Sequence, residues 1–159
     1  MGNQSLNLKE AISLIINESI EIKEISSTYK TAAWGNVDQD DFLNVVIKVV
    51  TKLNPFELLE KLLNIENRLG RTRGTVHWQP RSIDIDILYF NDEIITTQEL
   101  KIPHPYIAQR RFTLVPLNDI AANYIHPILK LSNSKLLENC EDQSEVQKTS
   151  FELLISNSN

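Results

Sequence analysis

The most constraining feature of this chain is a short run in which apolar and acidic residues alternate, Ile83-Asp84-Ile85-Asp86-Ile87. Side chains two residues apart on a β-strand point to the same face, so the three isoleucines share one face and the two aspartates share the other. The alternation predicts a half-buried strand that runs on to Phe90. Aspartate is a poor strand former and two close carboxylates repel each other, so an acidic face of this kind needs an explanation.

Two interpretations of Asp84 and Asp86 are open. The solvent face of the strand could simply be acidic, which is common. The pair could instead bind a divalent cation such as Mg²⁺, which takes carboxylate oxygens and leaves room for water and phosphate. The segment ahead of the pair contains Arg71, Arg73 and Arg81. A solvated basic loop would have this composition, but arginines beside a carboxylate pair favour a site for both phosphate and metal.

The composition limits the class of protein. The 159 residues favour one domain, 1–159, whose last stretch of roughly 20 residues is a polar tail. The net charge of -5 argues against non-specific binding to nucleic acid or to an anionic membrane. The single cysteine, Cys140, excludes an internal disulfide. The sequence contains neither an apolar run of membrane-spanning length nor a signal-peptide pattern, so we expect a cytoplasmic protein.

Periodicity and end signals predict a mixture of helices and strands. Asn54-Pro55-Phe56-Glu57 has the cap, the first-turn proline and the third-position acid of a helix start, and Gly70 suits its end. The other expected elements are a helix over 7–20, strands over 25–31 and 42–50, an extended piece over 94–97, a helix ending near 122 and a helix over 134–140.

Asn44 falls in the middle of the predicted strand 42–50, next to Phe42. The amide could be partly exposed, or it could recognise a flat polar ring that lies on Phe42. Its spacing alone favours the first interpretation, because a buried amide must find hydrogen-bond partners.

Four motifs then follow one another along the chain: Glu66-x-x-Leu69-Gly70-Arg71-x-Arg73, Trp78-x-Pro80-Arg81-x-Ile83-Asp84-Ile85-Asp86-Ile87, Pro103-His104-Pro105, and Arg110-Arg111-Phe112 with Leu117 behind it. In this order they resemble the 6-hydroxymethyl-7,8-dihydropterin pyrophosphokinase family of the folate pathway. The resemblance extends from about Asn7 to Ala122. It implies transfer of a pyrophosphoryl group from the co-substrate ATP to the hydroxymethyl group of a dihydropterin, with release of AMP.

The resemblance also assigns roles to individual residues. Asp84 and Asp86 would hold two Mg²⁺ ions against the triphosphate, and Arg71 and Arg81 would act with them in catalysis. The residues implied for ATP binding are Glu66, Arg73, His104 and Arg110. Those implied for the pterin are Thr31, Ala32, Phe42, Asn44, Trp78 and Phe112, with Phe42 and Phe112 on the two faces of the ring. Trp78 and the loop 32–41 would form a cover over both substrates.

The fold that the resemblance implies is α+β, a ferredoxin-like βαββαβ sheet with helices on one or both faces. The family opens with an apolar strand that ends in Gly-Ser-Asn, whereas Met1 stands almost directly ahead of the first expected helix. We therefore expect the first central strand to be missing from this chain, which would leave its neighbours with unpaired edges.

Two further hypotheses compete with an active enzyme. One is an inactive, N-terminally truncated relative that binds pterin or nucleotide without turnover. The other is a ferredoxin-like nucleic-acid module, against which the negative net charge weighs. The sequence does not indicate an oligomeric state.

Overall fold

The helix expected from Asn54 is present, with both hydrogen bonds of its capping box. The Asn54 Oδ1 accepts from the Glu57 N–H at 2.9 Å, and the Glu57 Oε1 accepts from the Asn54 N–H at 2.9 Å. The helix, α2, spans Pro55–Arg71, one residue past Gly70. The computed structural model describes residues 2–16, 19–32, 42–71 and 83–150.

The first helix, α1, spans Gly2–Ile15, so the prediction of a helix over 7–20 was wrong at both ends. Its buried residues Leu8, Ala11, Ile12 and Ile15 recur at helical spacing, whereas Ile16 is exposed. Ile20 was expected in this helix, but it begins the first strand and is only 1% exposed. A β-branched side chain fits a strand well, and from there Ile20 reaches the same core cluster as the helix.

Each of the two predicted strands 25–31 and 42–50 is divided in the structure. The strands in these regions are β1 (Ile20–Ile25), β2 (Tyr29–Thr31), β3 (Phe42–Asn44) and β4 (Ile47–Thr51).

The division occurs where Ser26 meets Val46. The Ser26 N–H donates to the Val46 carbonyl at 2.9 Å, and the Val46 N–H donates to the Ser26 Oγ at 2.9 Å. A side-chain hydroxyl thus replaces a backbone carbonyl as the acceptor, which interrupts the regular ladder. The alternation of apolar and polar residues within one segment cannot predict this contact, because the contact joins two separate segments.

The described strands pair antiparallel throughout. β1 pairs with β4, with an irregular register between Ile22 and Glu24. β2 lies between β3 and β7 (Gln147–Lys148), a strand from the C-terminal part of the chain. β5 (Ile95–Thr96) and β6 (Lys101–Ile102) form a small hairpin of their own, consistent with the extended piece expected over 94–97.

Short helices follow the hairpin. The 3₁₀ helix η1 (Ile107–Gln109) leads directly into α3 (Arg111–Ala121), and α4 (Asn133–Asn139) packs against α3. Asn133 is fully buried: its Oδ1 accepts from the Tyr89 hydroxyl at 2.7 Å, and its Nδ2 donates to the Ala121 carbonyl at 2.8 Å. One buried amide therefore connects the end of the acidic segment to both helices.

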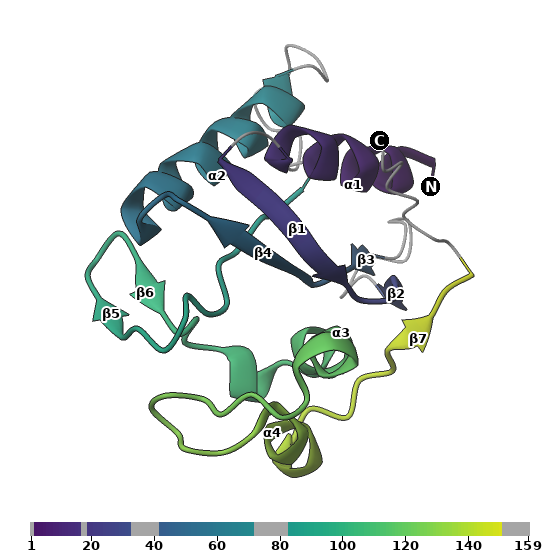
Figure 1. Cartoon of the computed structure of the whole chain (residues 1–159). Helices are drawn as coiled ribbons and strands as arrows, with labels where there is room; N and C mark the ends of the chain where they lie inside the picture. Colours follow the sequence, from purple (N-terminus) through teal and green to yellow (C-terminus); the bar gives the residue numbers. More distant parts are fainter. Residues whose placement is uncertain (1, 17–18, 33–41, 72–82, 151–159) are drawn as a thin grey trace.

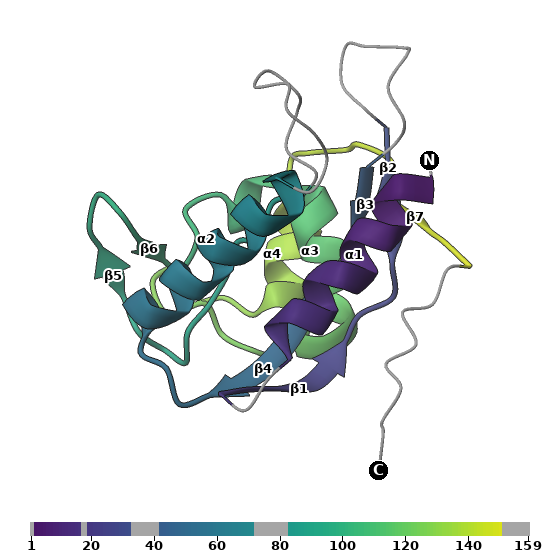
Figure 2. The same ribbon diagram turned by 90° about the horizontal axis from the view of Figure 1, so that it is seen from above.

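The helices lie on the two sides of the strand layer. α1 and α2 lie side by side above the β1–β4 ribbon, and α3 and α4 lie below it (Figure 1). Seen from above, α1 and α2 lie in front of α3 and α4, and the β1–β4 ribbon runs along one edge of the molecule (Figure 2). The larger apolar cluster joins α1, α2 and β1 and includes Ile83, Ile85 and Ile87, and the second joins η1, α3 and α4. Within the described ranges, no helix has the length and apolar character needed to cross a membrane.

The prediction of a strand from Ile83 to Phe90 was wrong, because these residues make no ladder of hydrogen bonds with another described strand. Its alternation holds, because the three isoleucines are partly buried against the core while Asp84 and Asp86 are exposed. No strand ladder is assigned over 83–90, however. A strand needs a neighbouring backbone edge, and the Ile85 N–H donates instead to the side chain of Glu66. The described chain is thus a mixed fold with four α-helices and antiparallel strand pairs, which is compatible with the expected α+β class.

Candidate functional site

A cavity of about 2200 Å³ opens between the two helical layers. β4 and the acidic segment line its walls, together with side chains from α1 and α3. The predicted site residues that line it are Thr31, Ala32, Phe42, Asn44, Asp84, Asp86, Arg110 and Phe112. Residues far apart in the sequence therefore meet in one place.

A side chain of helix α2 holds the backbone of the acidic pair. The Glu66 carboxylate accepts a hydrogen bond from the Ile85 N–H, between the two aspartates, at 2.6 Å. Asp84 and Asp86 are both exposed and both line the cavity. Glu66, which the resemblance implied for ATP binding, is thus seen to orient the backbone that carries the pair.

His104 lies beside the acidic pair and is partly buried. Its Nε2 is 3.9 Å from the Asp86 Oδ2, and its Nδ1 accepts from the Tyr106 N–H at 3.2 Å. Burial lowers the pKa of His104, the charge of Asp86 opposes that shift and Arg110 adds to it. The lowered pKa favours the neutral form of the ring. Because Nδ1 accepts a hydrogen bond, the proton of the neutral ring is on Nε2, facing Asp86.

Arg110 is flanked by two aromatic rings. Its Cζ is 4.9 Å from the ring centroid of Tyr106 and 5.7 Å from that of Phe112, within the range of cation–π contacts. Its backbone is fixed as well, because its carbonyl accepts from the Thr113 and Leu114 N–H groups at the start of α3. The Arg110 charge is thus held at the edge of the cavity.

Another part of the cavity wall is formed by the β2–β3 pair. Thr31 lies opposite Phe42 in this pair, and Tyr29 lies opposite Asn44. The Asn44 Nδ2 donates to the Thr31 Oγ1 at 3.1 Å, so the partly buried amide has a partner. Phe42 remains 47% exposed, which leaves its ring available for a flat ligand. A partly exposed amide with an internal partner is compatible with both interpretations of Asn44.

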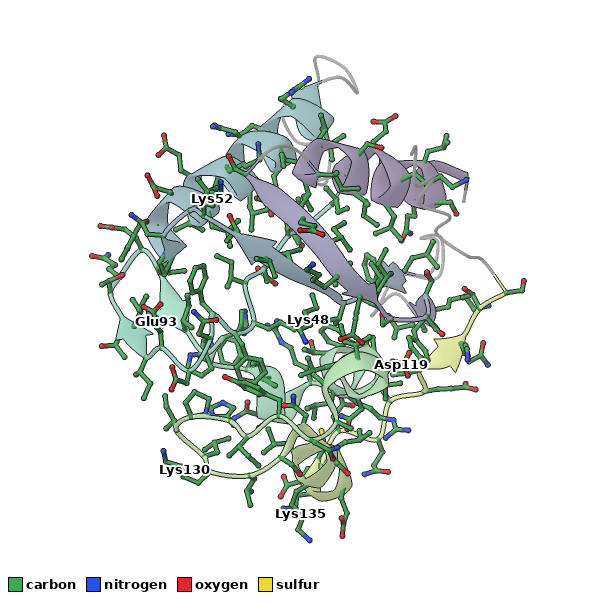
Figure 3. All side chains as sticks on the ribbon, viewed as in Figure 1. Lys48, Lys52, Glu93, Asp119, Lys130 and Lys135 are labelled. Carbon is green, nitrogen blue, oxygen red and sulfur yellow. The ribbon has the colours of Figure 1, made fainter. Side chains whose placement is uncertain are left out.

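A group of hydrogen bonds to Asp119 attaches this pair to α3. The Tyr29 hydroxyl donates to the Asp119 carboxylate at 2.8 and 2.9 Å, and the Ser27 N–H donates to the same carboxylate at 3.0 Å. Figure 3 labels Asp119 where α3 faces β2. Burial, followed by the hydrogen bond and charge of Asp119, raises the pKa of Tyr29 to about 12. Tyr29 therefore stays protonated and keeps donating across the physiological range.

The C-terminal part of the chain also reaches the cavity, which no sequence pattern predicted. Asp142 accepts from the Arg111 N–H at 3.0 Å and from the Ser144 N–H and hydroxyl. The hydrogen bonds from Ser144 lower the pKa of Asp142. Asp142 thus provides an acceptor at the first turn of α3, next to Arg110 and Phe112.

The structure leaves part of the expected site untested. Arg73, Trp78, Arg81 and the loop 33–41 lie outside the described residues, and Arg71 is described only as the last residue of α2. Tyr106 was missed by the sequence reasoning. Its only signal was an aromatic residue four positions ahead of Arg110 in a proline-rich segment.

The donor set of the acidic pair fits magnesium better than a metal held wholly by protein. Within the described ranges, no group of three or more His, Cys, Asp or Glu side chains could hold an ion. Mg²⁺ is typically bound by one or two carboxylates, with waters and substrate phosphates completing its coordination. Asp84 and Asp86, exposed at a cavity beside Arg110, offer this incomplete set.

The sequence is similar to one family of known proteins. The family model for 7,8-dihydro-6-hydroxymethylpterin-pyrophosphokinase matches residues 1–122. The chain is 46% identical over 115 residues to a 2-amino-4-hydroxy-6-hydroxymethyldihydropteridine pyrophosphokinase of Aquifex aeolicus, over 72% of this chain and 71% of the relative. It is 45% identical over 121 residues to the protein of that name in Bacillus subtilis, over 76% of this chain and 72% of the relative. A third, in Methylorubrum extorquens, is 38% identical over 126 residues, over 79% of each chain.

Proposed function

Because the chain belongs to the 7,8-dihydro-6-hydroxymethylpterin-pyrophosphokinase family, we propose that this cavity is the site of its pyrophosphoryl transfer. The substrates are ATP and 6-hydroxymethyl-7,8-dihydropterin, and the reaction belongs to folate biosynthesis. The observation that carries the assignment is the meeting of an acidic pair, a stacked arginine and an aromatic–amide wall around one cavity.

The reaction moves the β- and γ-phosphates together. The hydroxymethyl oxygen of the pterin forms a bond to the β-phosphorus of ATP, and the bond from that phosphorus to the α–β bridging oxygen breaks. AMP leaves with that oxygen, and the hydroxyl proton is released. Little covalent chemistry is left for the protein, so its main contributions are positioning and charge stabilisation.

Asp84 and Asp86 would hold Mg²⁺, two ions in all, at the cavity edge. When bound, the ions neutralise charge on the polyphosphate as the bond breaks. The chain itself supplies the two carboxylates and the Glu66 contact that holds their backbone. We assign no strong general base; Asp86 is the candidate if one acts, although metal binding is its main role.

Arg110 and His104 contact the phosphates in this proposal. The N–H groups of a guanidinium lie at its edge, so a ring stacked on its face leaves them free to bind phosphate oxygens. His104 offers the neutral Nε2–H described above. Glu66, Arg71, Arg73 and Arg81 complete the ATP and catalytic set, as the family resemblance implies.

The pterin would stack between Phe42 and Phe112, with Asn44, Thr31 and Ala32 at its edge and Trp78 in the cover. The exposed ring of Phe42 and the partly buried amide of Asn44 support this placement. Closure over the two substrates would exclude water, which competes with the hydroxymethyl group as acceptor.

We propose a ferredoxin-like sheet in which the place of the first central strand lies between β4 and the segment 83–89. Both line the cavity, and both helical layers contribute to its walls. Its volume of about 2200 Å³ exceeds the roughly 300–1,000 Å³ usual for small-molecule sites. The space could therefore hold an apolar strand as well as two substrates.

An AMP assay tests the proposed function. The purified chain with ATP, Mg²⁺ and the dihydropterin should form AMP, and omission of the dihydropterin should abolish it. The alternative of an inactive binding protein is not favoured, since the relatives named above are pyrophosphokinases. It would be supported by pterin binding without AMP above background.

A further inference from the structure

Tyr106 connects two of the groups assigned to the phosphates. Its backbone N–H donates to the His104 Nδ1 at 3.2 Å, and its ring meets the His104 ring edge-on with centroids 5.8 Å apart. The Arg110 Cζ lies 4.9 Å from the centroid of the same ring. One residue therefore contacts both groups, and neither contact depends on bound substrate.

The position of Tyr106 is not explained by core packing. Its side chain is 52% exposed, so it fills no place in the interior. Its backbone is anchored, because Tyr106 precedes η1 and its carbonyl accepts from the Gln109 N–H at 3.1 Å. The Arg110 N–H in turn donates to the Ile107 carbonyl at 3.4 Å. The segment 104–110 thus holds an exposed ring in a fixed place beside the cavity.

The two contacts have distinct physical consequences. The N–H donated to Nδ1 favours the tautomer of His104 that carries its proton on Nε2, which faces Asp86. The ring lies against the guanidinium face and restricts a long side chain that otherwise loses substantial entropy on binding. Each contact orders a group before the triphosphate arrives, and such preorganisation increases affinity.

We propose that Tyr106 is a positioning residue for ATP, holding Arg110 through its ring and His104 through its backbone N–H. This inference rests on the proposed function, in which Arg110 and His104 contact the phosphates. Substitution of Tyr106 tests only the contact of its ring with Arg110, because every variant keeps the backbone N–H that donates to His104.

The test compares Tyr106→Leu with the matched control Tyr106→Phe. Leucine removes the aromatic face, so the KM for ATP and the Kd of a non-hydrolysable ATP analogue should rise about threefold to thirtyfold. The KM for the dihydropterin should stay within about twofold, and Tyr106→Phe should bind the analogue like the wild type. Equal analogue affinity in wild type and Tyr106→Leu would overturn the inference, as would equal losses in the two variants.

Analogue binding measured in an Arg110→Ala variant distinguishes this inference from the proposed function. In Arg110→Ala, adding Tyr106→Leu should cause no further loss of analogue affinity, because the stacked partner is already gone. A full additional loss would overturn the positioning role while leaving the phosphate role of Arg110 intact. An Arg110→Ala variant that binds the analogue normally would instead refute that role and the inference with it. Coincident urea unfolding curves for all variants confirm that they fold alike.

Discussion

Glu66 on α2 holds the backbone of Ile85, through a hydrogen bond of 2.6 Å from the Ile85 N–H to its carboxylate. Ile85 lies between the two aspartates, so the contact sets the position of both carboxylates relative to the helix. A charged acceptor on a backbone N–H makes one of the stronger hydrogen bonds in proteins. The acidic segment is therefore attached to the fold by a side chain as well as by its isoleucines.

Removing this acceptor should weaken the fold and the site together. Glu66→Ala leaves the partly buried Ile85 N–H without its acceptor, which should lower the free energy of unfolding by about 1–3 kcal/mol. Glu66→Gln retains an acceptor oxygen and should lose less. Urea unfolding and kcat measured on both variants provide the check. Equal stability of the alanine variant and the wild type would show that the contact is dispensable.

Asp86→Ala should reduce turnover by several orders of magnitude, because half of the carboxylate pair proposed for magnesium is lost. The measurement is AMP formation at saturating ATP and dihydropterin, with the exposed Asp92 changed to alanine as a control outside the site. A reduction of less than about tenfold in Asp86→Ala would show that the pair is wrongly assigned.

Phe112→Ala should weaken dihydropterin binding by roughly tenfold or more, because one face of the proposed ring sandwich is removed. ATP analogue binding should change much less, since Tyr106 is the nearer of the two rings beside Arg110. Titration of each ligand separately makes the comparison. Equal losses for the two ligands would mean that Phe112 serves the packing of α3 rather than the pterin.

His126 should make the fold sensitive to acid. Its buried Nδ1 accepts from the Ile128 N–H at 3.2 Å and from the Leu129 N–H at 3.1 Å, and burial lowers its pKa. The unfolded chain then binds more protons near and below pH 6.5, so the His126 contribution is present above that pH and is lost as pH falls.

His126→Asn offers a matched variant, because an asparagine oxygen can accept the N–H two residues on and does not titrate. The free energy of unfolding, measured at pH 7.5 and pH 5, should fall less in this variant than in the wild type. An identical fall in both proteins would place the acid sensitivity elsewhere.

The proposed additional strand predicts a gain of stability. A variant that carries an apolar segment of about six residues, ending in Gly-Ser-Asn, ahead of Met1 should unfold at higher urea concentration than the chain alone. Amide exchange should slow at Ile47–Thr51 and over 83–89, the two edges that the strand would pair. Unchanged exchange at both edges would contradict the proposal.

Local chemistry predicted some of these elements well. The capping box at Asn54 was predicted from its spacing and is present with both hydrogen bonds, because every group it needs lies within four residues. The split between β3 and β4 was not predictable in this way. It depends on the hydroxyl of Ser26, a residue twenty positions away from its partner Val46.

The candidate site, like the fold, could be predicted from the sequence only in part. The sequence predicted which residue types matter, and eight of the named residues line one cavity. The strand prediction for 83–90 was wrong because alternation reports which face is buried, not which backbone pairs with it. The contacts of Tyr106 and Asp142 depend on how the chain returns to the cavity, and no local pattern in the sequence encodes that path.

The most direct test of the central claim is a count of bound metal. With Mn²⁺ in place of Mg²⁺, a non-hydrolysable ATP analogue and the dihydropterin, electron paramagnetic resonance should show about two ions bound per chain. The Asp84→Ala and Asp86→Ala variants should each lose bound Mn²⁺ under the same conditions. Variants that bind as many ions as the wild type would show that the two carboxylates do not hold the metal.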